Sequence, residues 1–257
     1  MQNLFPVLIF MLCDELLLSA FRALLTSVAN GGSGLISAQG VLFYAVYYYG
    51  DLLFLVWQAL AALLSLLVML RMTGQRPRDF ISDPKSAALS SPAAPHIDKK
   101  GFYLCAQAVF LCLFFNAFSA LFGAQRPARH YLLPELFVLC LCIPLIEEIV
   151  FRAVAYRELK IRTDERSALF ISSILFGIHH GALLSALYAF CAGILLALFF
   201  RDRGGIRASF AAHACMNLLT LVLSASGALG VLSSPGFCAA FFGLLVLSAA
   251  LYRKEAG

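Results

Sequence analysis

The sequence predicts an all-α fold, a polytopic transmembrane helix bundle of about eight spans. Of the 257 residues, 61% are hydrophobic and only 13% are charged, against roughly 25% charged residues in an ordinary soluble domain. The mean hydropathy is +0.87. So few charged side chains cannot cover the apolar surface of a soluble domain. The composition therefore excludes a soluble globular enzyme, a disordered protein and a nucleic-acid-binding module.

The apolar segments have lengths that suit membrane crossings, which need about 20 residues each. They lie at 4–29, 36–70, 101–123, 132–151, 167–184, 185–200, 206–226 and 231–252. The first has no Lys or Arg before it and is interpreted as an uncleaved helix, not a signal peptide. The second is too long for one straight span. Gly40 and Gly50 therefore predict a preliminary helix or a kink before a span at about 51–70.

The basic residues lie between the apolar segments and predict the orientation. Lys and Arg gather in 71–100, 152–166, 201–205 and the C-terminal residues, whereas the alternate loops carry few, among them Arg126 and Arg129. The positive-inside rule then places both termini in the cytoplasm. The net charge of +5 reflects this distribution, so no nucleic-acid partner is expected. We expect an integral membrane protein of a bacterial inner membrane, with the Pro- and Ser-rich segment 71–100 as a cytoplasmic linker.

The eight cysteines are interpreted as small buried hydrophobic residues. All lie within apolar segments, and no two form a CxxC pair. This pattern favours neither a disulfide framework nor a zinc ribbon.

Two adjacent carboxylates near the end of the 132–151 segment are the first candidate functional group. A charge in the middle of a membrane costs at least about 2.5–3.5 kcal/mol and is functional by default. Glu148 and Arg152 are spaced i,i+4 and can pair on one helix face, whereas Glu147 is turned about 100° away. We therefore expect a structural ion pair between Glu148 and Arg152, with Glu147 as the reactive carboxylate. The alternative is that both glutamates only cap a helix end.

Two further polar clusters lie in later apolar segments. Phe176 and His180 share one helix face, as do His213 and Asn217, because each pair is spaced i,i+4. His179 is expected to point elsewhere and to be an ordinary buried histidine. The alternative for His213 and Asn217 is interhelical hydrogen bonding, which is common in membrane bundles.

The three patterns occur in the order and on the separate spans of a known family. They are EExxxR at Glu147, Glu148 and Arg152, FxxxH at Phe176 and His180, and HxxxN at His213 and Asn217. Together they resemble the CAAX-protease and bacteriocin-processing (Abi) family of intramembrane glutamic endopeptidases. The resemblance covers about 132–226. It divides the chain into N-terminal transmembrane helices with the basic linker at 1–100, and a bundle at 101–257 that contains the protease core.

The resemblance implies peptide hydrolysis inside the membrane by an activated water. The residues matching Glu147 and His180 activate the water, and those matching His213 and Asn217 form an oxyanion hole. Glu148, Arg152 and Phe176 are then structural supports. No metal or other cofactor is expected. The implied partners are the lipid bilayer and a peptide or protein substrate, prenylated or not, while the oligomeric state is open.

Two other functions remain open at this point. A zinc metalloprotease can use Glu147, His180 and His213 as ligands. A non-enzymatic transporter or immunity protein can use the same groups in a proton relay. One conflict also remains, because His180 lies at the far end of the 167–184 segment, whereas Glu147 and His213 lie nearer the cytoplasmic ends of theirs.

Overall fold

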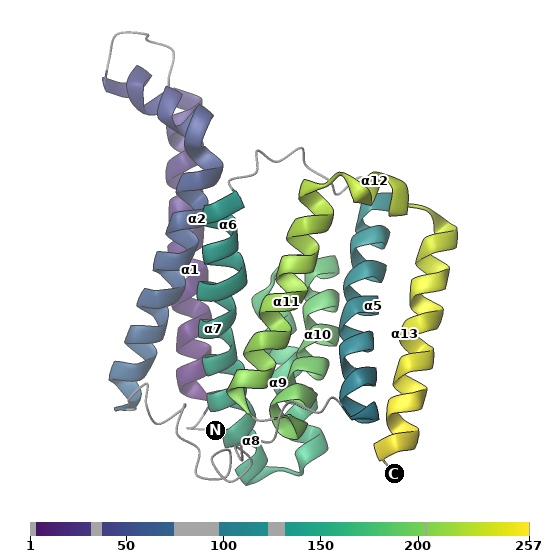
Figure 1. The fold of residues 1–257 in the computed structure, drawn as a ribbon. Helices are drawn as coiled ribbons and strands as arrows, with labels where there is room; N and C mark the ends of the chain where they lie inside the picture. The colour runs from purple at the N-terminus through teal and green to yellow at the C-terminus, as the bar shows by residue number, and fades with distance from the viewer. Residues whose placement is uncertain (1–3, 32–37, 75–97, 123–131, 204, 257) are drawn as a thin grey trace. The chain divides into compact units, whose positions relative to one another are not determined.

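The computed structural model describes residues 4–31, 38–74, 98–122, 132–203 and 205–256, and the fold is helical throughout this part of the chain (Figure 1). The predicted all-α class is therefore confirmed. Within the described residues, five helices are long and apolar enough to cross a membrane, at Tyr49–Met72, Lys99–Leu121, Leu183–Asp202, Ile206–Ala225 and Pro235–Glu255. The predicted count of about eight spans is not confirmed. Residues 76–97, which hold most of the predicted linker, and Arg126 and Arg129 lie outside the described residues.

The chain forms two compact units, of which the first comprises residues 1–75 and 129–146. Its helices α1 (Phe5–Gly31) and α2 (Ala38–Thr73) pack as a hairpin. Trp57 holds them together, because its indole N–H donates to the carbonyl of Leu17 at 3.0 Å and its ring stacks on Phe21. Since α2 is helical over its whole length, Gly50 does not end it, and the predicted span at about 51–70 lies in its C-terminal part.

The remaining elements of the first unit pack on α2. They are α6 (Leu132–Phe137), the π-helix η1 (Val138–Cys142) and the start of α7 (Ile143–Glu148). Leu55, Val138 and Ile143 form a small buried apolar cluster there. In lipid such contacts stabilise the unit by van der Waals packing, because the lipid tails are as apolar as these side chains.

The second unit comprises residues 76–128 and 147–257 and holds all three sequence motifs. Its elements are α5 (Lys99–Leu121), the π-helix η2 (Ile149–Tyr156), α8 (Arg157–Arg162), α9 (Glu165–His179), α10 (Leu183–Asp202), α11 (Ile206–Ala225), α12 (Ala228–Leu232) and α13 (Pro235–Ala256). In Figure 1, α13 lies beside α5, and α11 lies in front of α10. Aspartates begin two of these helices, because Asp98 accepts from the Gly101 N–H and Asp164 from the Ser167 N–H.

Helix α9 is short and packs closely on α10. Its fifteen residues span about 22 Å, less than the roughly 30 Å of a hydrocarbon core. Gly181, with φ of 69°, makes the turn into α10. Gly177 lies against α10 so closely that a Cβ there would come within 2.9 Å of the Ala186 carbonyl oxygen. The missing side chain therefore sets the spacing of the two helices.

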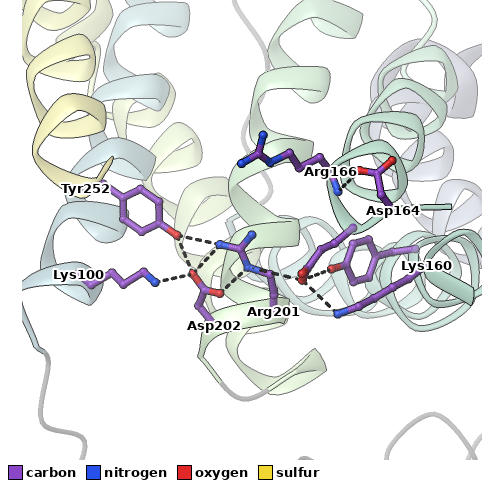
Figure 2. A network of polar contacts seen from close by, with 9 residues as sticks. Lys100, Lys160, Asp164, Arg166, Arg201, Asp202 and Tyr252 are labelled. Carbon is purple, nitrogen blue, oxygen red and sulfur yellow. Dashed lines mark hydrogen bonds and ion pairs between the residues drawn. The ribbon is translucent and has the colours of Figure 1, made fainter. Parts of the chain in front are cut away.

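The basic segments of the second unit meet at one end of the bundle. Figure 2 shows their contacts: Lys100 of α5 pairs with Asp202 at 3.6 Å, and the Tyr252 hydroxyl donates to the same carboxylate at 2.6 Å. Arg201 reaches both Asp202 and Glu165 at the start of α9. Residues 99–100, 160–165, 201–203 and 252–254 thus share one end, here called the basic end. This agrees with the alternation predicted from the positive-inside rule.

Ion pairs and hydrogen bonds keep the carboxylates at the basic end charged. A hydrogen bond from the Lys160 ammonium, at 3.1 Å, lowers the pKa of the Glu165 carboxyl. The Arg203 guanidinium lies 2.6 Å from Asp98 and, with the Gly101 N–H, lowers the pKa of that carboxyl. Because these groups are partly exposed, each pair adds little to stability, and their effect is to fix helix ends relative to one another.

Candidate active site

The glutamate pair lies at a change of helix type. Helix α7 ends at Glu148, and the π-helix η2 starts at the next residue, with all eight of its residues buried. Glu147 is 6% exposed, whereas Glu148 and Arg152 are fully buried. Single π-helical turns are rare and often occur at functional sites. The sequence did not predict this element, which contains Arg152.

Glu148 and Arg152 form the predicted ion pair. The Arg152 Nε lies 3.3 Å from Glu148 Oε2, and the guanidinium carbon lies 4.8 Å from the centre of the Phe176 ring. Among the described residues, the Arg152 Nη atoms have no hydrogen-bond partner. The carboxylate and the ring face therefore provide the stabilisation of this buried charge.

His213 of α11 lies between the two carboxylates. Its Nδ1 is 3.1 Å from Glu148 Oε1, and its Nε2 is 3.6 Å from Glu147 Oε2. A carboxylate only accepts hydrogen bonds, so the Nδ1 carries the proton in this contact. Glu148 thereby fixes the tautomer of His213 and aims its Nε2 at Glu147. Asn217 follows one turn later on α11 and is partly buried.

The C-terminal end of α9 brings both histidines of the FGIHH segment near this group. The His180 Nδ1 lies 2.9 Å from the carbonyl oxygen of Phe176, to which it donates. The His179 Nε2 lies 3.9 Å from Glu147 Oε1, and its side chain is only 10% exposed. The prediction that His179 points away from the other groups is therefore wrong. Residues at both i+3 and i+4 from Phe176 lie near its helix face, so the spacing alone did not separate the two histidines.

Phe176 is the common neighbour that joins the three motifs. Its ring centre lies 4.6 Å from that of His180 and 5.7 Å from that of His213, and it also contacts Arg152 and Phe151. The conflict over the depth of His180 is thereby resolved. The Phe176 ring contacts the rings of both His180 and His213, so the end of α9 and this part of α11 lie at the same level of the bundle.

The candidate metal ligands do not form a recognisable metal site. Within the described ranges, no group of three or more His, Cys, Asp and Glu side chains has the geometry to hold an ion. Glu147 lies between two imidazoles, and its distances to His213 and His179 are 3.6 and 3.9 Å.

Comparison with known proteins finds one family model that is similar to part of the chain. Residues 129–219 match the family model for Rce1-like proteins, described as type II CAAX prenyl endopeptidase. The matched segment contains all three motifs, so the resemblance drawn from them is confirmed. No curated protein and no solved structure matches the chain. The family and the apolar helices together support a membrane protease of the CAAX-protease type.

Proposed function

We propose that this chain is an intramembrane endopeptidase that cleaves a membrane-associated peptide or protein with a water activated by Glu147. The observation that carries the proposal is the position of the Glu147 carboxylate. It is 6% exposed, and its two oxygens face the Nε2 atoms of His213 and His179 at 3.6 and 3.9 Å. A buried carboxylate beside imidazoles is suited to take and return a proton.

The reaction is the addition of water to a peptide bond without a covalent enzyme intermediate. The water oxygen forms a bond to the carbonyl carbon, the carbonyl π electrons move to its oxygen, and one water proton passes to Glu147. When the C–N bond breaks, that proton goes to the leaving amine. The products are a carboxylic acid and an amine, so no oxidant, reductant or cofactor is needed.

His180 and the α11 pair complete the proposed mechanism. His180 donates through Nδ1 to the Phe176 carbonyl, so its Nε2 can accept a hydrogen from the water. His213 and Asn217 stabilise the oxyanion, as the family motif implies. Since Glu148 holds the Nδ1 proton of His213, its Nε2 can donate to the oxyanion only after receiving a second proton. Glu147, 3.6 Å away, can lend it the proton taken from the water, and this proton returns to Glu147 before it goes to the leaving amine.

The proposed partners are the lipid bilayer and a peptide or protein substrate of the CAAX type, prenylated or not. We place the protein in a bacterial inner membrane with the basic end, and both termini, in the cytoplasm. The support for this orientation is the grouping of basic side chains at one end of the second unit. No metal and no nucleic acid has a role in the proposed reaction.

The test is a comparison of membrane proteomes from cells that produce either the unaltered protein or Glu147→Gln. Glutamine keeps the size of the side chain and its hydrogen bonding but removes the base. We expect peptides with new termini to disappear in the variant, while its abundance and thermal unfolding stay unchanged. Identical peptide sets in the two membranes would refute proteolysis and favour a binding or transport function.

A further inference from the structure

His179 belongs to none of the three motifs, yet the structure places it against the reactive carboxylate. Its Nε2 lies 3.9 Å from Glu147 Oε1, and its ring packs 5.5 Å from the Phe151 ring. The side chain is 10% exposed, so it does not point to the lipid. The preceding residue, Ile178, is 60% exposed. The exposed face of α9 at this level is therefore the face of Ile178 and not that of His179.

The distance between His179 and Glu147 suits a bridging water. A separation of 3.9 Å is too long for a direct hydrogen bond. A water about 2.8 Å from both atoms would make an angle of about 90° between them, close to the directions in which water forms hydrogen bonds. Both side chains have buried neighbours, because Glu147 adjoins Glu148 of the buried ion pair and the His179 ring packs on Phe151.

We infer that His179 is a further catalytic residue, whose Nε2–H donates to the attacking water and orients it. This inference rests on the proposed function. The water then gives its hydrogens to Glu147 and His180 and accepts one from His179. Three of its four hydrogen-bonding directions are thereby occupied, and the remaining lone pair is directed at the peptide carbonyl. Fixing a nucleophile in this way lowers the entropic part of the barrier.

The inference predicts which substitutions at position 179 keep activity. His179→Gln retains an N–H donor of similar reach, whereas His179→Ala removes the donor. We expect the rate of substrate-peptide cleavage to fall about 10²-fold in His179→Ala and to recover most of that loss in His179→Gln. If His179 only filled space, His179→Leu, the matched apolar variant, would cleave the substrate at least as fast as His179→Gln.

The experiment follows the time course of new peptide termini in membranes of cells that produce each variant. Ile178→Ala, on the lipid-facing side of the same helix turn, is the control and should cleave at the unaltered rate. If Glu147→Gln loses the termini but His179→Ala and His179→Leu cleave normally, the role of His179 is refuted and the proposed function stands. If Glu147→Gln also cleaves normally, the proposed function itself fails.

A crystal structure of the unaltered protein in lipid gives a second, substrate-independent measurement. We expect an ordered water within about 3.2 Å of both Glu147 Oε1 and His179 Nε2. A direct hydrogen bond between these two atoms, with no water between them, would overturn the inference. The inference would also be refuted if His179→Gln were as inactive as His179→Leu.

Discussion

Removal of the Arg152 guanidinium should destabilise the protein more than removal of the reactive carboxylate. Arg152 and Glu148 are both fully buried and lie 3.3 Å apart. Breaking a buried pair by deleting one partner typically costs about 3–5 kcal/mol, because the other charge is left uncompensated. Glu148 keeps its hydrogen bond from His213, so we expect the lower value, about 3 kcal/mol, for Arg152→Ala.

The assay is thermal unfolding of purified protein in lipid nanodiscs, together with its abundance in membranes. For a chain of this size, a loss of about 3 kcal/mol corresponds to a decrease of roughly 6–12 °C in Tm. Glu147→Gln should unfold within a few degrees of the unaltered protein. A double variant, Glu148→Gln with Arg152→Met, removes both charges and should recover much of the loss. The structural role of Arg152 would be refuted if Arg152→Ala kept normal abundance and a normal Tm and lost only its activity.

Three further predictions follow from other features. Gly177→Ala should lower Tm, because the added Cβ would lie 2.9 Å from the Ala186 carbonyl oxygen. The control Gly243→Ala, which has open space around it, should leave Tm unchanged. Equal Tm values for the two variants would contradict the close packing of α9 on α10. Treatment with a strong chelator should leave peptide cleavage in membranes intact. If the chelator abolished cleavage and zinc alone restored it, the metalloprotease alternative would be supported. Lys254→Cys, in a background without the native cysteines, should react with an impermeant maleimide only after the inner membrane is opened; labelling from the outside of intact cells would reverse the proposed orientation.

The sequence predicted the fold class and part of the site because those features depend on local chemistry. Composition alone identified a helical membrane protein, and the i,i+4 spacing predicted the contact between Glu148 and Arg152. The position of His179 was missed because helical spacing allowed both neighbouring histidines near Phe176. The π-helix η2 was missed because its sequence, IVFRAVAY, carries no signal that distinguishes a π-helix from an α-helix.

The lengths of the elements were less predictable than their type. The 167–184 segment was expected to be a full span, but α9 ends at His179 and the chain turns at Gly181. Hydropathy does not distinguish a helix that crosses the bilayer from one that ends within the bundle. The contact of His213 with both carboxylates was also not predictable, since it depends on how α11 packs on η2.

The depth of the site sets a length scale for any chain that reaches it. His213 lies seven residues along α11 from Ile206, at the basic end, a rise of about 10 Å. An extended peptide advances about 3.3–3.6 Å per residue. A chain that enters from the basic end therefore needs about three extended residues to bring a peptide bond level with the carboxylate and the imidazoles. In the proposed reaction, this length would set the distance between the basic end of the bundle and the peptide bond that is cut.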